Sequence, residues 1–306
     1  RDIAAYVQSE FVHALQQSVS TVLRETGGNR LVISGGVGLN CAANSVLRQT
    51  MPIDLFAFPA CSDCGLAIGN ALFGYWRLTG TFPSPADKSM LYGKEYTAEE
   101  IRDALLREPH TVPPGGLRHG DLRFERSTDV VTHAAQLISE GKIIGWWQHR
   151  SESGPRALGS RSLLASPNSP HMRDLINAKV KLRERFRPFG ASVLQSDAGA
   201  LVERSREYPY MIEAPRVTHE GLVRLSECVH VDGSSRLQTV PDDAPYCFAN
   251  LLRQLAAIRG SSAVLNTSFN IGEPIVESPG DAIATFLRSG IDALVLDSYV
   301  CTRSEH

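Results

Sequence analysis

Apolar positions along the first 82 residues alternate between helical and strand spacing. Apolar side chains recur every three or four residues from Ile3 until Gly27-Gly28, which predicts a helix. Two compact apolar runs then predict buried strands, and a glycine-containing turn and a helix follow each of them. The predicted order is helix 3–26, strand 31–33, helix to about 48, strand 55–58 and helix 66–78. This alternation indicates an α/β fold.

The second half of the chain shows the same alternation of predicted helices and strands, after a stretch of different amino-acid composition. Residues 83–120 are rich in proline and glycine around a short helix at 98–107, so we interpret them as a linker between two domains. Beyond it we expect helices at 129–139, 248–258 and 281–288 and strands at 143–147, 191–194, 263–265 and 293–296. An Asp-Gly turn within 230–240 predicts a hairpin that presents Arg236 and Gln238.

Composition narrows the class of protein. The chain has 306 residues, 42% of them hydrophobic, and a net charge of -2, which gives no global argument for binding nucleic acid. No apolar run reaches the roughly 18 residues of a membrane span, and nothing near Arg1 resembles a signal peptide. Six scattered cysteines fit a reducing compartment, so we expect a cytoplasmic protein. The abrupt helical start suggests a missing upstream segment.

One segment, residues 150–187, carries far more positive charge than the nearly neutral chain as a whole. Between Arg150 and Arg187 the chain carries nine basic residues against three acidic ones, beginning at the glycine-rich Ser153–Gly159. A solvated basic face is the common outcome of such a run. The irregular spacing and the aromatic Phe186 and Phe189 favour another hypothesis, in which loop amides and inward-facing guanidinium groups converge on a phosphate.

Three further stretches are candidate ligand sites. Gly35 and Gly36 lie between a strand and a helix, where free amides can bind an anion, although a plain tight turn is the alternative. Asp63 precedes a helix, so it is either an N-cap, the commoner role, or a metal ligand. Cys61 and Cys64 lack partners at zinc spacing and are interpreted as ordinary thiols. The third stretch, Asn266–Asn270, places short polar side chains at a strand end.

Five motifs resemble those of the O-carbamoyltransferases that modify natural products, including the tobramycin, cephamycin, nodulation-factor and ansamycin enzymes. They are SGGVGLNCAAN, SESGPRALGSRS, NAKVKLRERFRPF, HVDGSSRLQTV and NTSFNIGEPIV. The resemblance implies an enzyme that makes carbamoyl adenylate from carbamoyl phosphate and ATP. The carbamoyl group would then pass to a hydroxyl of a small-molecule natural product, as in antibiotic biosynthesis.

The resemblance also implies two domains and a set of site residues. Residues 1–82 would be the tail of an actin/Hsp70-like (Kae1-like) transfer domain, 83–120 a linker, and 121–306 a YrdC-like adenylate-forming domain. The implied catalytic residues are Arg156, Lys181, Arg187 and Arg236, and the implied substrate- or nucleotide-binding residues are Gly35, Gly36, Asn40, Asn44, Asn266 and Ser268. Asp63 would bind a divalent metal, Fe²⁺ or Mg²⁺.

Departures from the family pattern leave alternatives open. The family carries a His-x-x-x-His metal-binding pair upstream, and this chain has none. We therefore expect a carboxy-terminal portion of a longer enzyme, which lacks a complete metal site and acceptor pocket without its amino-terminal part. The alternatives are a non-catalytic nucleotide-binding module and a threonylcarbamoyl-type transferase acting on tRNA, which would need a basic surface beyond the site.

Overall fold

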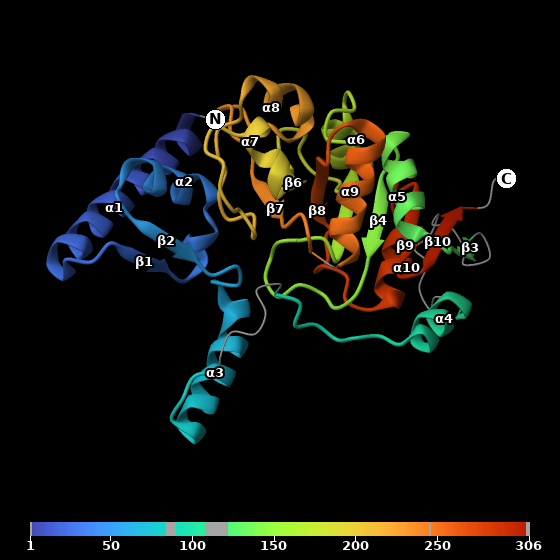
Figure 1. The fold of residues 1–306 in the computed structure, drawn as a ribbon, viewed down its shortest axis with the longest axis horizontal. Helices are drawn as coiled ribbons and strands as arrows, with labels where there is room; N and C mark the ends of the chain where they lie inside the picture. Colours follow the sequence, from blue (N-terminus) through green and yellow to red (C-terminus); the bar gives the residue numbers. More distant parts are fainter. Residues whose placement is uncertain (1, 84–89, 108–121, 245, 304–306) are drawn as a thin grey trace. The chain divides into compact units, whose positions relative to one another are not determined.

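The computed structural model describes residues 2–83, 90–107, 122–244 and 246–303. They divide into two compact units, each with its own sheet (Figure 1). Unit 1 comprises Arg1–Pro83 together with Ile212–Ala214, and unit 2 comprises Ser84–Met211 and Pro215–His306. Helices and strands mix in both, so the predicted α/β class is confirmed. The predicted linker 83–120 lies partly outside the described residues, and the predicted domain assignments stay predictions.

Unit 1 is built on two parallel strands. Its elements are α1 (Asp2–Thr26), β1 (Arg30–Ile33), η1 (Gly36–Leu39), α2 (Cys41–Thr50), β2 (Asp54–Ala57), η2 (Asp63–Gly65) and α3 (Leu66–Thr79). Val19 of α1, Leu47 of α2 and the strand residues Ile33 and Leu55 form its buried core. Because β1 and β2 run parallel, the loops that follow them lie at the same edge of the sheet.

Unit 2 holds an eight-stranded mixed sheet. Its strands are β3 (Leu122–Arg126), β4 (Ile144–Trp147), β5 (Arg161–Ala165), β6 (Gly190–Leu194), β7 (Leu237–Val240), β8 (Val264–Ser268), β9 (Ala293–Leu296) and β10 (Tyr299–Arg303). They lie in the order β3-β10-β9-β4-β5-β8-β6-β7. The pairs β4–β9 and β6–β7 are parallel, and the other pairs are antiparallel.

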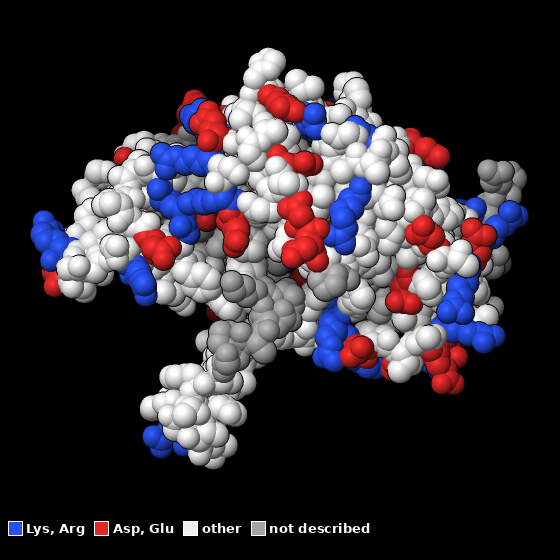
Figure 2. Space-filling view, in the orientation of Figure 1, with Lys and Arg blue, Asp and Glu red and all other residues white. Residues whose placement is uncertain are grey.

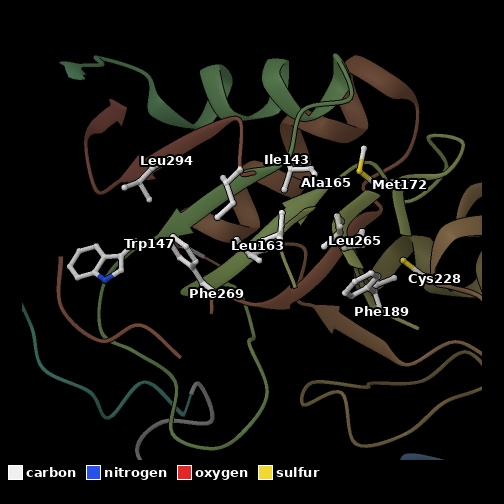
Figure 3. Packing of buried hydrophobic residues seen from close by; sticks show 14 of the residues in the cluster. Ile143, Trp147, Leu163, Ala165, Met172, Phe189, Cys228, Leu265, Phe269 and Leu294 are labelled. Atoms are coloured by element: carbon white, nitrogen blue, oxygen red, sulfur yellow. The ribbon is translucent and has the colours of Figure 1, made fainter. Parts of the chain in front are cut away.

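Helices cover both faces of this sheet (Figure 1). They are α4 (Ala98–Leu106), α5 (Val130–Ser139), α6 (Met172–Lys179), α7 (Ala198–Leu201), α8 (His219–Arg224), α9 (Cys247–Arg259) and α10 (Pro279–Leu287), with the short turns η4 (Gln195–Asp197) and η5 (Ser226–Cys228). Alternate strand residues point to opposite faces. Trp146 of β4 accordingly packs with α5 and α9, whereas Trp147 joins a second core with Leu163, Phe269 and Leu294 (Figure 3).

The predicted helices and strands are present within a few residues of their expected bounds, and one expected motif is wrong. Residues 230–240 do not form a hairpin, because β7 begins at Leu237 and pairs in parallel with β6. The Asp232 carboxylate accepts from the amide and the hydroxyl of Ser234. This local bonding satisfies the turn without a partner strand. The sequence patterns also missed β3, β5, α6 and β10.

Candidate functional site

Polar side chains gather at one end of the unit 2 sheet. In the strand register Ser162 of β5 lies opposite Ser268 of β8, and Ser192 of β6 lies opposite Gln238 of β7. Asn266 of β8 lies on the same face as all four, two residues before Ser268. We call Ser162, Ser192, Gln238, Asn266 and Ser268 the polar strand end. The remainder of this face is the apolar core beneath α5 and α9.

Lys181 lies beside the polar strand end. Its side chain is almost fully buried, and Nζ donates to the carbonyl and hydroxyl oxygens of Ser268 and to the carbonyl and Oδ1 of Asn270, over 2.5 to 3.1 Å. Ser268 Oγ also donates to Asn270 Oδ1 over 2.7 Å. The predicted residues Lys181 and Ser268 are therefore in direct contact.

Positively charged side chains lie close enough to Lys181 to influence its protonation. Burial, and then the charge of Arg183, lower the pKa of Lys181 to about 7, against an opposing influence from Glu273. The pKa of Arg183 is itself lowered by burial and by the charge of Arg187. Like charges in partly buried positions repel one another, so an anion placed among them would relieve the repulsion.

Arg236 reaches the same region from the start of β7. A β-carbon built on Gly190 would lie 3.3 Å from Arg236 Nε, and Gly190 is the register partner of Asn266. The side chain of the half-buried Arg236 is thus adjacent to β6, the strand that pairs with the one carrying Asn266. The glycine leaves room for it, because a larger side chain there would press on the arginine.

The glycine-rich loop before β5 is organised by Glu152. The carboxylate of Glu152 accepts from the amides of Leu158, Ser160 and Arg161 over 2.7 to 3.3 Å. The prediction that the amides of this loop converge on an anionic ligand is wrong for these three. An internal carboxylate already satisfies them.

The basic run does not fold inward as a whole. Arg187 is half exposed and pairs with Glu184 over 2.9 Å, and Arg185 is exposed. Arg161 is fully buried, but its guanidinium donates to backbone carbonyls and stacks on Trp147, with 3.9 Å between the guanidinium carbon and the ring centroid. Arg156 is half-buried in the loop that Glu152 organises. Lys181 and Arg161 are thus the buried basic residues of this run, whereas Arg156 and Arg183 are half-buried.

Unit 1 places its candidate residues at the carboxyl ends of β1 and β2. Gly35 has a φ of 85°, and neither Gly35 nor Gly36 has an atom within 4 Å of a built β-carbon. The side chain of Asn40 accepts from the amide of Ala43 over 3.1 Å, so it caps α2. Asn44 is fully buried, and its Nδ2 donates to Gly38 O and Ile212 O, each over 2.8 Å.

Asp63 is exposed in the first turn of η2, where Ser62 takes the N-cap position. It lies at the edge of the sheet shared with Gly35, because it follows β2. Within the described ranges, no group of three or more His, Cys, Asp or Glu side chains is placed to hold a metal ion. Protein metal sites commonly use three or more such side chains, so the described residues do not form a complete metal site around Asp63.

Sequence patterns did not indicate Glu152 or Ser192 as site residues, and indicated Gln238 only through the wrong hairpin. Ser192 and Gln238 break the apolar runs of short buried strands, and a polar residue inside such a run is the signal that could have found them. Glu152 had no comparable signal, because a single acid in a basic run is ordinary.

Figure 2 shows acidic and basic side chains interspersed on the face in view, without a basic stripe. Among the described helices, none has both the length and the apolar composition that crossing a membrane requires.

Fold and site together define an α/β protein in which the cationic Lys181 lies beside the neutral polar strand end, an arrangement that suits an anionic ligand. Two family models match the chain: "Carbamoyltransferase C-terminus" over residues 135–303 and "Carbamoyltransferase N-terminus" over residues 1–72. This chain belongs to the carbamoyltransferase family. The expectation of a purely carboxy-terminal portion is not borne out, because the amino-terminal model also matches.

Curated relatives agree with this family. The nodulation protein NolNO of Sinorhizobium fredii is 38% identical over 98% of this chain and 44% of the relative. A 3'-hydroxymethylcephem-O-carbamoyltransferase of Amycolatopsis lactamdurans is 33% identical over 91% of this chain and 50% of the relative. The chain spans about half the length of these relatives. A solved structure of full-length HypF aligns with 60% of this chain and 22% of the HypF chain, with 13% identity and a TM-score of 0.36.

Proposed function

We propose that this chain takes part in ATP-dependent carbamoyl transfer, from carbamoyl phosphate to a hydroxyl of a small-molecule natural product. Unit 2 would form carbamoyl adenylate, and unit 1 would contribute to the transfer step. Membership of the carbamoyltransferase family supports the reaction class. The location rests on the buried amine of Lys181, which donates to Ser268 of the polar strand end and is close enough to Arg183 for that charge to lower its pKa.

The proposed chemistry in unit 2 needs charge neutralisation more than a side-chain nucleophile. Carbamate, released from carbamoyl phosphate by water together with inorganic phosphate, attacks the α-phosphorus of ATP and expels pyrophosphate. Lys181, Arg183 and Arg236 would offset the negative charge as the two anions approach. Arg156 and Arg187 belong to the same proposal, as residues that would turn towards the nucleotide. Asn266 and Ser268 would hold the carbamoyl group by neutral hydrogen bonds.

Unit 1 has a smaller part in the proposal. Gly35 and Gly36 leave open space beside the amides that precede α2, where a phosphate of the nucleotide could bind. Asn40 and Asn44 would shape this turn, since both are bonded within it. Asp63 would offer one oxygen to a divalent cation, Fe²⁺ or Mg²⁺. Actin/Hsp70-like (Kae1-like) and YrdC-like folds for residues 1–82 and 121–306 are likewise part of the proposal.

Isotope exchange between pyrophosphate and ATP in the presence of carbamoyl phosphate tests this function. The wild-type chain should catalyse the exchange, and Lys181→Met should lower its rate roughly a hundredfold, because a charge-stabilising donor is lost. Lys179→Met, an exposed lysine two residues away, is the matched control and should keep the wild-type rate.

Two results would count against the proposal. ATP binding without exchange would favour a non-catalytic nucleotide-binding module. Exchange that depends on threonine and bicarbonate in place of carbamoyl phosphate would favour threonylcarbamoyl chemistry.

A further inference from the structure

A chain of hydrogen bonds fixes which way the side-chain amide of Asn266 points. It begins at the carbonyl oxygen of Leu158, in the loop organised by Glu152, which accepts from Gln238 Nε2 over 2.9 Å. A carbonyl oxygen can only accept, so Gln238 must turn its NH₂ group towards the loop. Gln238 Oε1 then faces the neighbouring strand as an acceptor.

The next two links follow from the first. Ser192 Oγ lies 2.7 Å from Gln238 Oε1 and must donate its one hydrogen there. The lone pairs of Ser192 Oγ can still accept a hydrogen bond, and Asn266 Nδ2 donates to this oxygen over 2.9 Å. Asn266 Nδ2 also donates to Gln238 Oε1 over a longer distance of 3.4 Å. Both hydrogens of the Asn266 NH₂ group are therefore directed at this pair.

The opposite end of the Asn266 amide is left with an unused acceptor. Asn266 is fully buried, and within the described residues its Oδ1 accepts no hydrogen bond. A buried acceptor without a donor is costly, because the oxygen has lost its contacts with water. Such an atom in a native fold calls for a donor that the structure does not contain.

We propose that Gln238 and Ser192 are positioning residues that hold Asn266 Oδ1 as an acceptor for the NH₂ group of the carbamoyl substrate. This inference rests on the proposed function and assigns the choice of acyl group to three neutral side chains. Carbamoyl phosphate carries hydrogen-bond donors on its acyl group, whereas acetyl phosphate has a methyl group at the same place and an identical phosphate. The site should therefore prefer the carbamoyl compound.

Equilibrium binding of the two acyl phosphates to the 306-residue chain, measured by calorimetry, tests the assignment. For the wild type, the dissociation constant of acetyl phosphate should exceed that of carbamoyl phosphate by about tenfold or more, because acetyl phosphate leaves Asn266 Oδ1 without a donor. In Asn266→Leu the ratio should fall to near one. In Ser192→Ala and Gln238→Met it should fall part of the way, because the Asn266 amide can then rotate.

Two features keep this test informative. Ser139→Ala, which removes an exposed hydroxyl on α5, is the matched control and should leave the ratio at its wild-type value. The comparison of the two ligands on the wild type needs no substitution, so it holds even if a variant fails to fold. A general loss of packing would weaken both ligands together and leave the ratio unchanged.

The outcomes separate this inference from the proposed function. A wild type that exchanges pyrophosphate but binds both acyl phosphates equally overturns the role of Asn266 alone. In another outcome, the variants lose ATP binding and keep the wild-type ratio of the two acyl phosphate dissociation constants. That result would assign Asn266 Oδ1 to the nucleotide and would also overturn the proposed role. A wild type with neither exchange nor affinity for carbamoyl phosphate overturns both.

Discussion

At the scale of single residues, Lys181 combines deep burial with a titratable charge. Its side chain is 6% exposed, and burial followed by the charge of Arg183 lowers its pKa from 10.5 to about 7. Four oxygens lie within 2.5 to 3.1 Å of Nζ, but their acceptance does not offset the cost of burying the charge. The residue therefore titrates near neutral pH, where a phosphate ligand could change its protonation.

The lowered pKa predicts how stability depends on pH. Between pH 7 and 10.5 the unfolded chain keeps a proton on Lys181 that the folded chain loses, so the contribution of this group to stability rises with pH over that range. The slope should be at most about 1.4 kcal/mol per pH unit. Urea unfolding at pH 7, 8 and 9 should show it in the wild type and not in Lys181→Met. Equal slopes in the two proteins would assign the titration elsewhere.

At the scale of elements, the loop before β5 depends on Gly159. This residue has a φ of +108°, and a β-carbon on it would lie 2.2 Å from the Phe248 ring of α9. Its carbonyl also accepts from Trp146 Nε1 over 2.9 Å. Backbone shape, ring packing and strand contact all fix the loop at this one position.

Gly159→Ala should lower the free energy of unfolding by about 3 kcal/mol or more, because both the strained φ and the clash oppose the new methyl group. Gly69→Ala in α3 is the contrasting control. It meets open space in a helix and should be neutral or stabilise by up to about 1 kcal/mol. Thermal melts of the two variants measure the difference. Equal melting temperatures would refute the role of Gly159.

Local patterns predicted elements well where spacing was clean and poorly where charge interrupted it. The helix 3–26 and the strand 293–296 have uninterrupted apolar spacing and match α1 and β9. The strand β5 was missed because it begins at Arg161, whose burial depends on carbonyls of residues 148, 149 and 277. These partners lie 12, 13 and 116 residues from Arg161, so the short pattern of the strand itself does not contain them.

The candidate site likewise has features that the sequence predicted and features that it could not. The nearness of Lys181 to Ser268 followed from the family resemblance, not from their spacing of 87 residues. The links through Gln238 and Ser192 depend on the parallel pairing of β6 and β7, which the expected hairpin excluded. Register across strands, set by the whole sheet, decides which side chains meet.

At the scale of the whole molecule, three residues from the second half of the chain belong to unit 1. The amide of Ala214 donates to Ser45 Oγ over 2.8 Å, and Arg48 Nε lies 3.4 Å from the buried carboxylate of Glu213. Together with the bond from Asn44 to Ile212, these contacts hold the tripeptide against α2.

A double variant, Ser45→Ala with Arg48→Met, should release this tripeptide. Cleavage after Glu213 by a glutamate-specific protease should then accelerate about tenfold or more, because local opening loses a hydrogen bond and an ion pair. Arg24→Met on α1, whose guanidinium donates to the hydroxyl of nearby Thr21 over 3.3 Å, is the control and should be cut at the wild-type rate. Unchanged cleavage in the double variant would contradict the arrangement.

The carboxylate of Glu152 has a consequence for the thermodynamics of ligand capture. Because it already satisfies the amides of Leu158, Ser160 and Arg161, the segment acquires its shape during folding. A ligand that binds at the neighbouring strands therefore meets a loop that is already ordered. Little of its binding free energy is lost to ordering that loop. Association should accordingly be fast and should not require a slow rearrangement of this segment.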